Sequence, residues 1–312
     1  MAGRRSGGST QAEADLATIV TRRHDALRAE TGPARAGKVA GVHQARVASR
    51  RLREVVPILG RGLEDVHRKS LRRDLRALTR ALGPVRELDV ARSMIEELAL
   101  DSPDAGRLTT AWQDNLERKR RAPMRDLRKA LGATPRRALD RELDGFAASR
   151  TTSGNDRWRQ ALAQRLSARA EDLRDQMVHA GTRYEPEPLH QVRIAAKKLR
   201  YVLEITGEAG LAAVARPLRT LKAAQESLGR LHDFDVLLTF LRGVPGTAPG
   251  EPLQHAAANA VSVIERESRV LHGRYLRSRP ALLRVAESTL ADIVPKVRPA
   301  AEPGKDEGPR GH

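Results

Sequence analysis

Two basic segments that share one order of residues carry the chemistry that this sequence offers. The first begins at His43 and the second begins at His190. In both, the order is histidine, glutamine, any residue, arginine, a hydrophobic residue, alanine, any residue, two basic residues, leucine and arginine. Arginine can hold a phosphate group through paired N–H donors, and lysine adds a mobile positive charge. The repeated segment therefore predicts recognition of an anion.

Each segment predicts a helix whose basic residues share one face. On an α-helix of about 3.6 residues per turn, residues three and four apart lie one above the other. Apolar residues occupy the opposite face, as expected when one side of a helix packs into a core. A single arginine-rich helix is usually a solvated surface, but a duplicated stripe with few carboxylates favours a binding site. The candidate residues on the stripes are His43, Arg46, Arg50 and Arg53, and then His190, Arg193, Lys197 and Arg200; Arg51 and Lys198, off the stripes, are second-tier candidates.

The helices expected after each motif add further basic residues. Over 63–82, arginines lie on one side and leucines lie on the other side. Over 209–228 the same arrangement returns, although Glu226 replaces one of the basic residues. We therefore expect the second of these helices to contribute less. The candidates on this pair of helices are Arg73, Arg76, Arg80, Arg219 and Lys222.

Composition points to an anionic partner. Among the 312 residues, 57 Lys and Arg against 39 Asp and Glu give a net charge of +18. Aromatic residues make up only 3% of the chain, which argues against binding of single-stranded nucleic acid by base stacking. There is no cysteine, no apolar run long enough to span a membrane and no apolar core of a signal peptide near the start. We expect a cytoplasmic protein without membrane association.

The chain is predicted to be all-α and internally duplicated. Nothing alternates with a period of two for long, so no strands are expected. Two halves related by a pseudo-twofold axis would let the stripes face a common basic groove. Glycine and proline predict helix ends at Gly32-Pro33, Gly83-Pro84 and Gly229, and a break near Pro123. The expected divisions are a disordered N-terminus over 1–12, a helical half over 13–148, a linker over 149–156, a second helical half over 157–293 and a disordered tail over 294–312.

Catalysis is not expected from these residues. Neither a phosphate-binding glycine loop nor a nucleophile elbow is present. His43 and His190 could meet across the pseudo-twofold axis, but the motif segments lack nearby acids, so no metal and no cofactor is expected. Four acids follow the second pair of helices, and their expected role is structural, either in helix caps or in pairs with motif arginines. These acids are Glu87, Asp89, Asp233 and Asp235.

The duplicated motif resembles the signature of the CHAD family, the conserved histidine α-helical domain. The resemblance covers about residues 12–293, and it implies two related four-helix bundles. It also implies non-catalytic binding of inorganic polyphosphate by the basic residues named above, with localisation at polyphosphate granules as a further expectation.

General polyanion binding or duplex DNA binding is the alternative reading. Phosphate contacts give affinity for DNA without sequence preference as readily as they give affinity for polyphosphate. No helix-turn-helix, zinc-finger or ribonucleoprotein signature is visible in the chain.

Overall fold

The described part of the chain consists of helices and contains no strand, which confirms the all-α expectation. The computed structural model describes residues 7–60, 65–98, 105–149, 157–242 and 251–299. Its elements are α1 (Gly7–Arg35), α2 (Val39–Leu59), α3 (Asp65–Glu97), α4 (Ala105–Ala130), α5 (Ala133–Ala148), α6 (Arg157–Ala180), α7 (Pro186–Glu208), α8 (Ala215–Arg242), α9 (Glu251–Ser288), a π-helical turn (Thr289–Ile293) and α10 (Val294–Val297).

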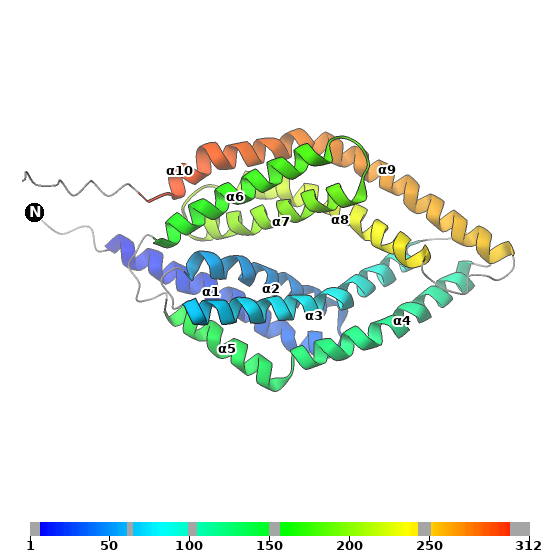
Figure 1. The fold of residues 1–312 in the computed structure, drawn as a ribbon, viewed down its shortest axis with the longest axis horizontal. Coiled ribbons are helices and arrows are strands. Elements are labelled where there is room, and N and C mark those ends of the chain that lie inside the picture. The colour runs from blue at the N-terminus through cyan, green and yellow to red at the C-terminus, as the bar shows by residue number, and fades with distance from the viewer. Residues whose placement is uncertain (1–6, 61–64, 99–104, 150–156, 243–250, 300–312) are drawn as a thin grey trace, which may run out of the picture.

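The helices form two groups that face each other (Figure 1). In the first group α1 packs on α2, α2 on α3 and α3 on α4, and α5 lies against α1 and α3. In the second group α6 packs on α7, α7 on α8 and α8 on α9. Across the interface, α2 meets α6 and α7, and α3 meets α8. The two motif helices, α2 and α7, therefore lie on the inner sides of their groups.

The motif helices form because their apolar faces are continuous. On α2, Val42, Leu52 and Val56 are fully buried. On α7, Leu199 and Val202 are buried in the same way. Full burial of a side chain of this size stabilises the fold by about 1.5–3 kcal/mol. The basic residues that share these helices are thereby held on the opposite face.

The expected helix end at Gly83-Pro84 is wrong, because α3 continues from Asp65 to Glu97. Proline in a helix interior costs about 3 kcal/mol, since it lacks an N–H and its ring crowds the preceding turn. The apolar face of α3 stays in register across this point, where Leu78, Leu82 and Val85 are all buried. Burial on both sides of the proline offsets its cost.

The helix end expected at Gly32-Pro33 is close to the observed one, because α1 ends at Arg35. The break expected near Pro123 is wrong, since α4 continues through this proline from Ala105 to Ala130. The helix α8 likewise continues past Gly229.

The ends of the chain also differ in part from expectation. The first helix begins at Gly7, inside the segment expected to be disordered, and α10 occupies the start of the segment expected to be a tail. The expectations for residues 1–6, 150–156 and 300–312 lie outside the described residues. No described helix combines the length and the apolar composition that a membrane span requires.

Ion pairs connect the two groups of helices. Arg23 on α1 pairs with Glu208 at the end of α7 at 2.9 Å. Glu54 on α2 receives Arg165 of α6 at 2.8 Å and Arg169 of the same helix at 3.4 Å. These pairs are partly buried, so solvent screens them less than it screens surface pairs. They hold α2 against α6 although both groups carry many positive charges.

A buried ion pair between α3 and α4 gives a stability prediction. The Nε atom of Arg120 lies 2.7 Å from Oδ1 of Asp89, whose side chain is only 2% exposed. Arg120 also donates to the carbonyl oxygen of Gly37 at 2.9 Å. The variant Asp89→Ala should lower the free energy of unfolding by about 3–5 kcal/mol, because Arg120 would stay buried without its counter-ion. Urea unfolding measures this change.

The matched control is Arg92→Ala on the same helix. Arg92 forms an exposed pair with Glu96 at 3.2 Å. Its loss should change the free energy of unfolding by about 0.5 kcal/mol or less. A loss for Asp89→Ala that is no larger than the loss for this control would contradict the assigned role.

Candidate functional site

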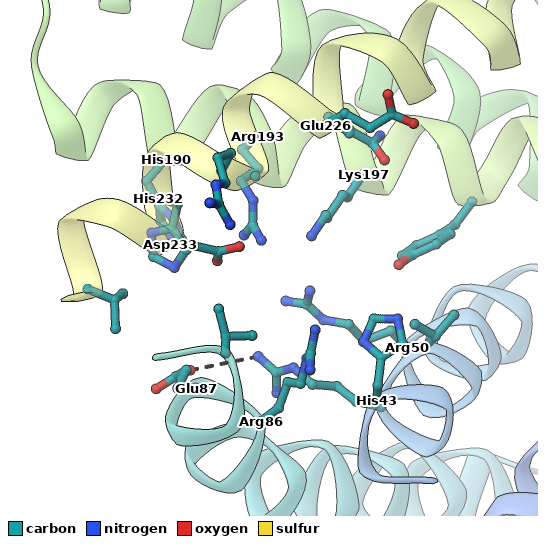
Figure 2. A pocket seen from close by; sticks show the side chains of 18 residues that line it. His43, Arg50, Arg86, Glu87, His190, Arg193, Lys197, Glu226, His232 and Asp233 are labelled. Atoms are coloured by element: carbon teal, nitrogen blue, oxygen red, sulfur yellow. Dashed lines mark ion pairs between the residues drawn. The ribbon is translucent and has the colours of Figure 1, made fainter. Parts of the chain in front are cut away.

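A cavity lies between the two groups of helices, where α2 and α3 face α7 and α8 (Figure 2). Its volume is about 590 Å³. Basic residues dominate its walls, with several imidazoles and a smaller number of carboxylates among them. The basic and histidine residues are Arg46, Arg50, Arg86, Arg193, Lys197 and Arg230, with His43, His190 and His232; the carboxylates are Glu87, Glu226 and Asp233.

The first part of each motif stripe lies on this cavity. From α2 come His43, Arg46 and Arg50, and from α7 come His190, Arg193 and Lys197. Figure 2 shows the labelled side chains of α7 reaching in from one side and those of α2 from the other. Residues far apart in the chain therefore form one site, because both motif helices bury their apolar faces away from it.

Three further predicted residues lie outside the cavity on the first group of helices. Arg53 is half-buried one turn along α2, and burial together with the charges of Arg50, Arg76 and Arg80 lowers its pKa. Both Arg76 and Arg80 are exposed on α3. The positive charge that begins in the cavity thus continues along α2 and α3.

The remaining predicted residues do not line this cavity. Arg73, Arg219 and Lys222 are exposed, and Arg73 pairs with Asp74 at 2.9 Å. Three others are held by carboxylates. Glu204 receives Arg51 at 3.0 Å and Arg200 at 3.5 Å, and Asp172 lies 3.4 Å from Lys198. Those side chains help to position α7 against α2 and α6.

Arg46 reaches the cavity across Gly83. Its Nη1 atom donates to the carbonyl oxygen of Thr79 at 3.2 Å. A Cβ atom on Gly83 would lie only 3.0 Å from this same nitrogen. At the matching place on α8, a Cβ on Gly229 would lie 3.8 Å from Nε of Arg193. Gly83, which the sequence suggested to be a helix end, therefore gives Arg46 room to cross α3, whereas a Cβ atom at Gly229 would make only an ordinary contact with Arg193.

The four acids have different roles. Glu87 lies 3.9 Å from Arg46 and so forms the pair with a motif arginine that was one of the two expected roles (Figure 2). Burial raises the pKa of Asp233, while the nearby charges of Arg193 and Lys197 act in the opposite direction. Asp89 pairs with Arg120, and Asp235 accepts a hydrogen bond from Tyr184 at 3.0 Å. None of the four caps a helix, because α3 and α8 continue through them.

Several residues of the cavity wall were not among the sequence candidates for binding, and three of them stand at matching places of the two halves or next to such a place. Arg86, His232 and Asp233 come from the second parts of α3 and α8, beyond the expected helix ends. The sequence did contain a signal for them. Polar residues recur at matching distances after Leu82-Gly83 and Leu228-Gly229, and a continuous helix places them near the motif stripes.

Burial and neighbouring positive charges lower the pKa values of basic residues in the cavity. Burial, followed by the charge of Arg50, lowers the pKa of Arg46 to about 10. Burial and then the charges of Arg193 and Arg50 lower the pKa of Lys197 to about 7. The ammonium form of Lys197 is therefore only partly populated at neutral pH. An anion in the cavity would favour the charged form and draw in protons.

The histidines of the cavity also have lowered pKa values. Burial comes first among the causes that lower the pKa of His43 and of His190. The rings of His190 and His232 lie with their centroids 4.0 Å apart, tilted by 35°. Burial and the charge of Arg193 lower the pKa of His232 to about 3. Neutral imidazoles of this kind can donate a hydrogen bond to an anion through one ring nitrogen.

Within the described ranges, no three histidine or acidic residues lie close enough together to hold a metal ion. The guanidinium, ammonium and imidazole groups of the cavity can bind anions directly.

The fold and the cavity define an all-helical protein with a basic cavity between two groups of helices. The model of the CHAD domain matches residues 18–242, so the chain belongs to the CHAD family. The crystal structure of the CHAD domain from the plant Ricinus communis is similar, with 21% identity, a TM-score of 0.58 and coverage of 90% of this chain and 91% of that one. PptA from Streptomyces chartreusis is also similar, with 16% identity, a TM-score of 0.54 and coverage of 89% and 99%. At these identities the similarity shows the fold. No curated protein matches the chain.

The lowered pKa of His232 gives a pH prediction. Between about pH 6.5 and pH 3 the unfolded chain binds a proton at this histidine more readily than the folded chain does. Stability should therefore fall as the pH falls through this range. The variant His232→Gln should lose about 1 kcal/mol less than the wild type between pH 6.5 and pH 5, a figure that allows for solvent screening of a half-buried ring.

Urea unfolding at the two pH values measures this difference. His179→Gln on α6 is the control, because His179 is an exposed histidine outside the cavity. The control should lose as much stability on acidification as the wild type. An equal loss in His232→Gln would show that this ring does not contribute to acid sensitivity.

Proposed function

We propose that this protein binds inorganic polyphosphate without catalysing a reaction on it. The proposal rests on one observation, which is that basic residues of both motif helices line the same cavity. Three residues of α2 and three of α7, all able to donate to phosphate, line the same cavity. Membership of the CHAD family supports the choice of ligand, because the motif that resembles the family signature is the one on the cavity wall.

A linear chain of phosphates needs cations and N–H donors along its path and no recognition of bases. Arg46, Arg50 and Arg193 supply paired donors, and Lys197 supplies a point charge. Outside the cavity, Arg53 and the exposed Arg76 and Arg80 would extend the path along α2 and α3. A long chain could therefore contact more cations than the cavity alone contains.

The free energy for binding comes partly from the charge crowding in the free protein. Like charges held close together raise the free energy of the folded state, and a polyanion would relieve that repulsion. Proton uptake by Lys197 on binding would add to the attraction. Glu87 and Asp233 act in the free protein as internal counter-ions that a bound phosphate would replace. Localisation at cytoplasmic polyphosphate granules would follow from this binding.

Duplex DNA is the alternative ligand, and the position of the site argues against it. The six motif residues lie on the facing sides of two groups of helices, so we expect a thin flexible chain to reach them more readily than a rigid duplex does. Exposed arginines elsewhere could still attract DNA by charge alone.

Neutralising the cavity tests the site. The combined variant Arg46→Gln, Arg50→Gln, Arg193→Gln and Lys197→Gln should weaken polyphosphate binding by about 100-fold or more, because several charge-assisted contacts are lost together. The titration uses labelled long-chain polyphosphate at near-physiological salt, and circular dichroism checks that the helical content is retained.

The matched control removes the same number of basic residues from the exposed side of α4. It combines substitutions to Gln at Arg118, Arg121, Arg125 and Arg128, which lie outside the cavity. This variant should bind polyphosphate within a few-fold of the wild type. Equal losses in the two variants would mean that net charge, and no particular site, sets the affinity.

A competition titration separates the two ligand classes. Unlabelled polyphosphate should displace the labelled chain at a far lower phosphate concentration than duplex DNA or RNA does, because only the thin chain reaches the cavity. If DNA competes equally per phosphate, general polyanion binding is the better description of this protein.

A further inference from the structure

Lys197 differs chemically from every other basic residue on the cavity wall. It is the single lysine among the described residues that line the cavity, and the first motif has Arg50 at the matching position. Its neighbour Lys198 lies 3.4 Å from Asp172. No carboxylate of the described chain lies within 4.0 Å of the Lys197 amine. Figure 2 shows this side chain extended toward the open space between the helices.

An amine can attack an electrophile, whereas a guanidinium is always protonated and cannot. Burial and the charges of Arg193 and Arg50 lower the pKa of Lys197 to about 7, so much of the amine is neutral at physiological pH. An ordinary lysine, with a pKa near about 10.4, is neutral in fewer than about one molecule in a thousand. A lysine desolvated beside other cations is a recognised form of activated nucleophile.

The arginines around the Lys197 amine favour an electrophile that carries a phosphate group. Guanidinium groups of Arg50 and Arg193 border the same cavity and would hold a phosphate dianion near Lys197. An electrophilic carbon joined to that phosphate would then lie beside the amine, and holding the two reactants together raises the rate of their reaction. A carboxylic acid joined to phosphate, an acyl phosphate, has this form.

We propose that Lys197 is a site of self-acylation by acyl phosphates bound in the cavity. The Lys197 nitrogen attacks the carbonyl carbon, and an amide bond forms as the bond between that carbon and the phosphate oxygen breaks. The proton released by the amine passes to the departing phosphate, which leaves as hydrogen phosphate, and nothing is oxidised or reduced. This inference rests on the anion-binding part of the proposed function and does not require polyphosphate to be the ligand.

Acylation would also regulate the site. The amide carries no positive charge and occupies part of a cavity of about 590 Å³. Removal of a lysine charge weakens the attraction for phosphate. A protein modified in this way should therefore bind polyanions more weakly, and the extent of modification would follow the concentration of acyl phosphates.

The test treats the full chain with acetyl phosphate near pH 7.5 and follows each lysine by mass spectrometry. Lys197 should be acetylated at least about tenfold faster than Lys198 or Lys222, because more of its amine is neutral and the reagent is held beside it. Inorganic phosphate and polyphosphate should each slow the reaction at Lys197. With 4-nitrophenyl acetate, which carries no phosphate, the preference for Lys197 should be smaller.

Two variants link the modification to binding. Acetyl phosphate treatment should weaken polyphosphate binding by the chain with Lys198→Arg, and it should leave binding by the chain with Lys197→Arg unchanged from its own untreated value. Equal acetylation of Lys197 and Lys198, or no protection by inorganic phosphate, would overturn the proposal. Selective acetylation with phosphate protection in a protein that does not bind polyphosphate would support this inference and refute the proposed function.

Discussion

Repulsion between like charges on α2 and α7 is the constraint around which this structure is arranged. Arg46 and Arg50 on one helix face Arg193 and Lys197 on the other across a shared cavity. In water these cations would separate. Apolar packing behind each helix holds them in place, since each motif helix has an almost unbroken buried face. Ion pairs beside the cavity, such as Arg51 with Glu204 and Arg165 with Glu54, join the facing groups of helices.

The same constraint explains why the cavity has unusual acid–base properties. A cation that is buried among other cations can lower its free energy by losing its proton, and Lys197 and the histidines can do so whereas arginine seldom does. The cavity therefore combines permanent charges with groups whose charge depends on what is bound. An anion in the cavity would contact the fixed guanidinium groups and would favour the charged form of Lys197. The exposed Glu87 and the largely buried Asp233 offset part of the repulsion in the free protein.

Local backbone chemistry was a poor guide to where the helices end. Gly83-Pro84 reads as a helix end because proline lacks a donor and glycine favours disorder. The apolar spacing of α3 nevertheless continues through it, from Leu75 and Leu82 to Val85, and all three are buried. The glycine has a different use, since its missing side chain leaves room for the guanidinium of Arg46. Gly229 lies beside Arg193 on the other side, although a Cβ atom there would make only an ordinary contact.

The sequence by itself determined the helical class, the face of each motif helix and the identity of its basic residues, because helical spacing is a local property of the chain. It also predicted an anionic ligand, because the net charge of a chain is the sum over its residues. Tertiary structure alone decided which cations meet. His43 and Arg50 join the cavity, while Arg51 turns to Glu204 and Lys198 turns to Asp172. Packing between distant helices also brings Arg86, His232 and Asp233 to the cavity and lowers the pKa of Lys197. Residue spacing along one segment does not describe such packing.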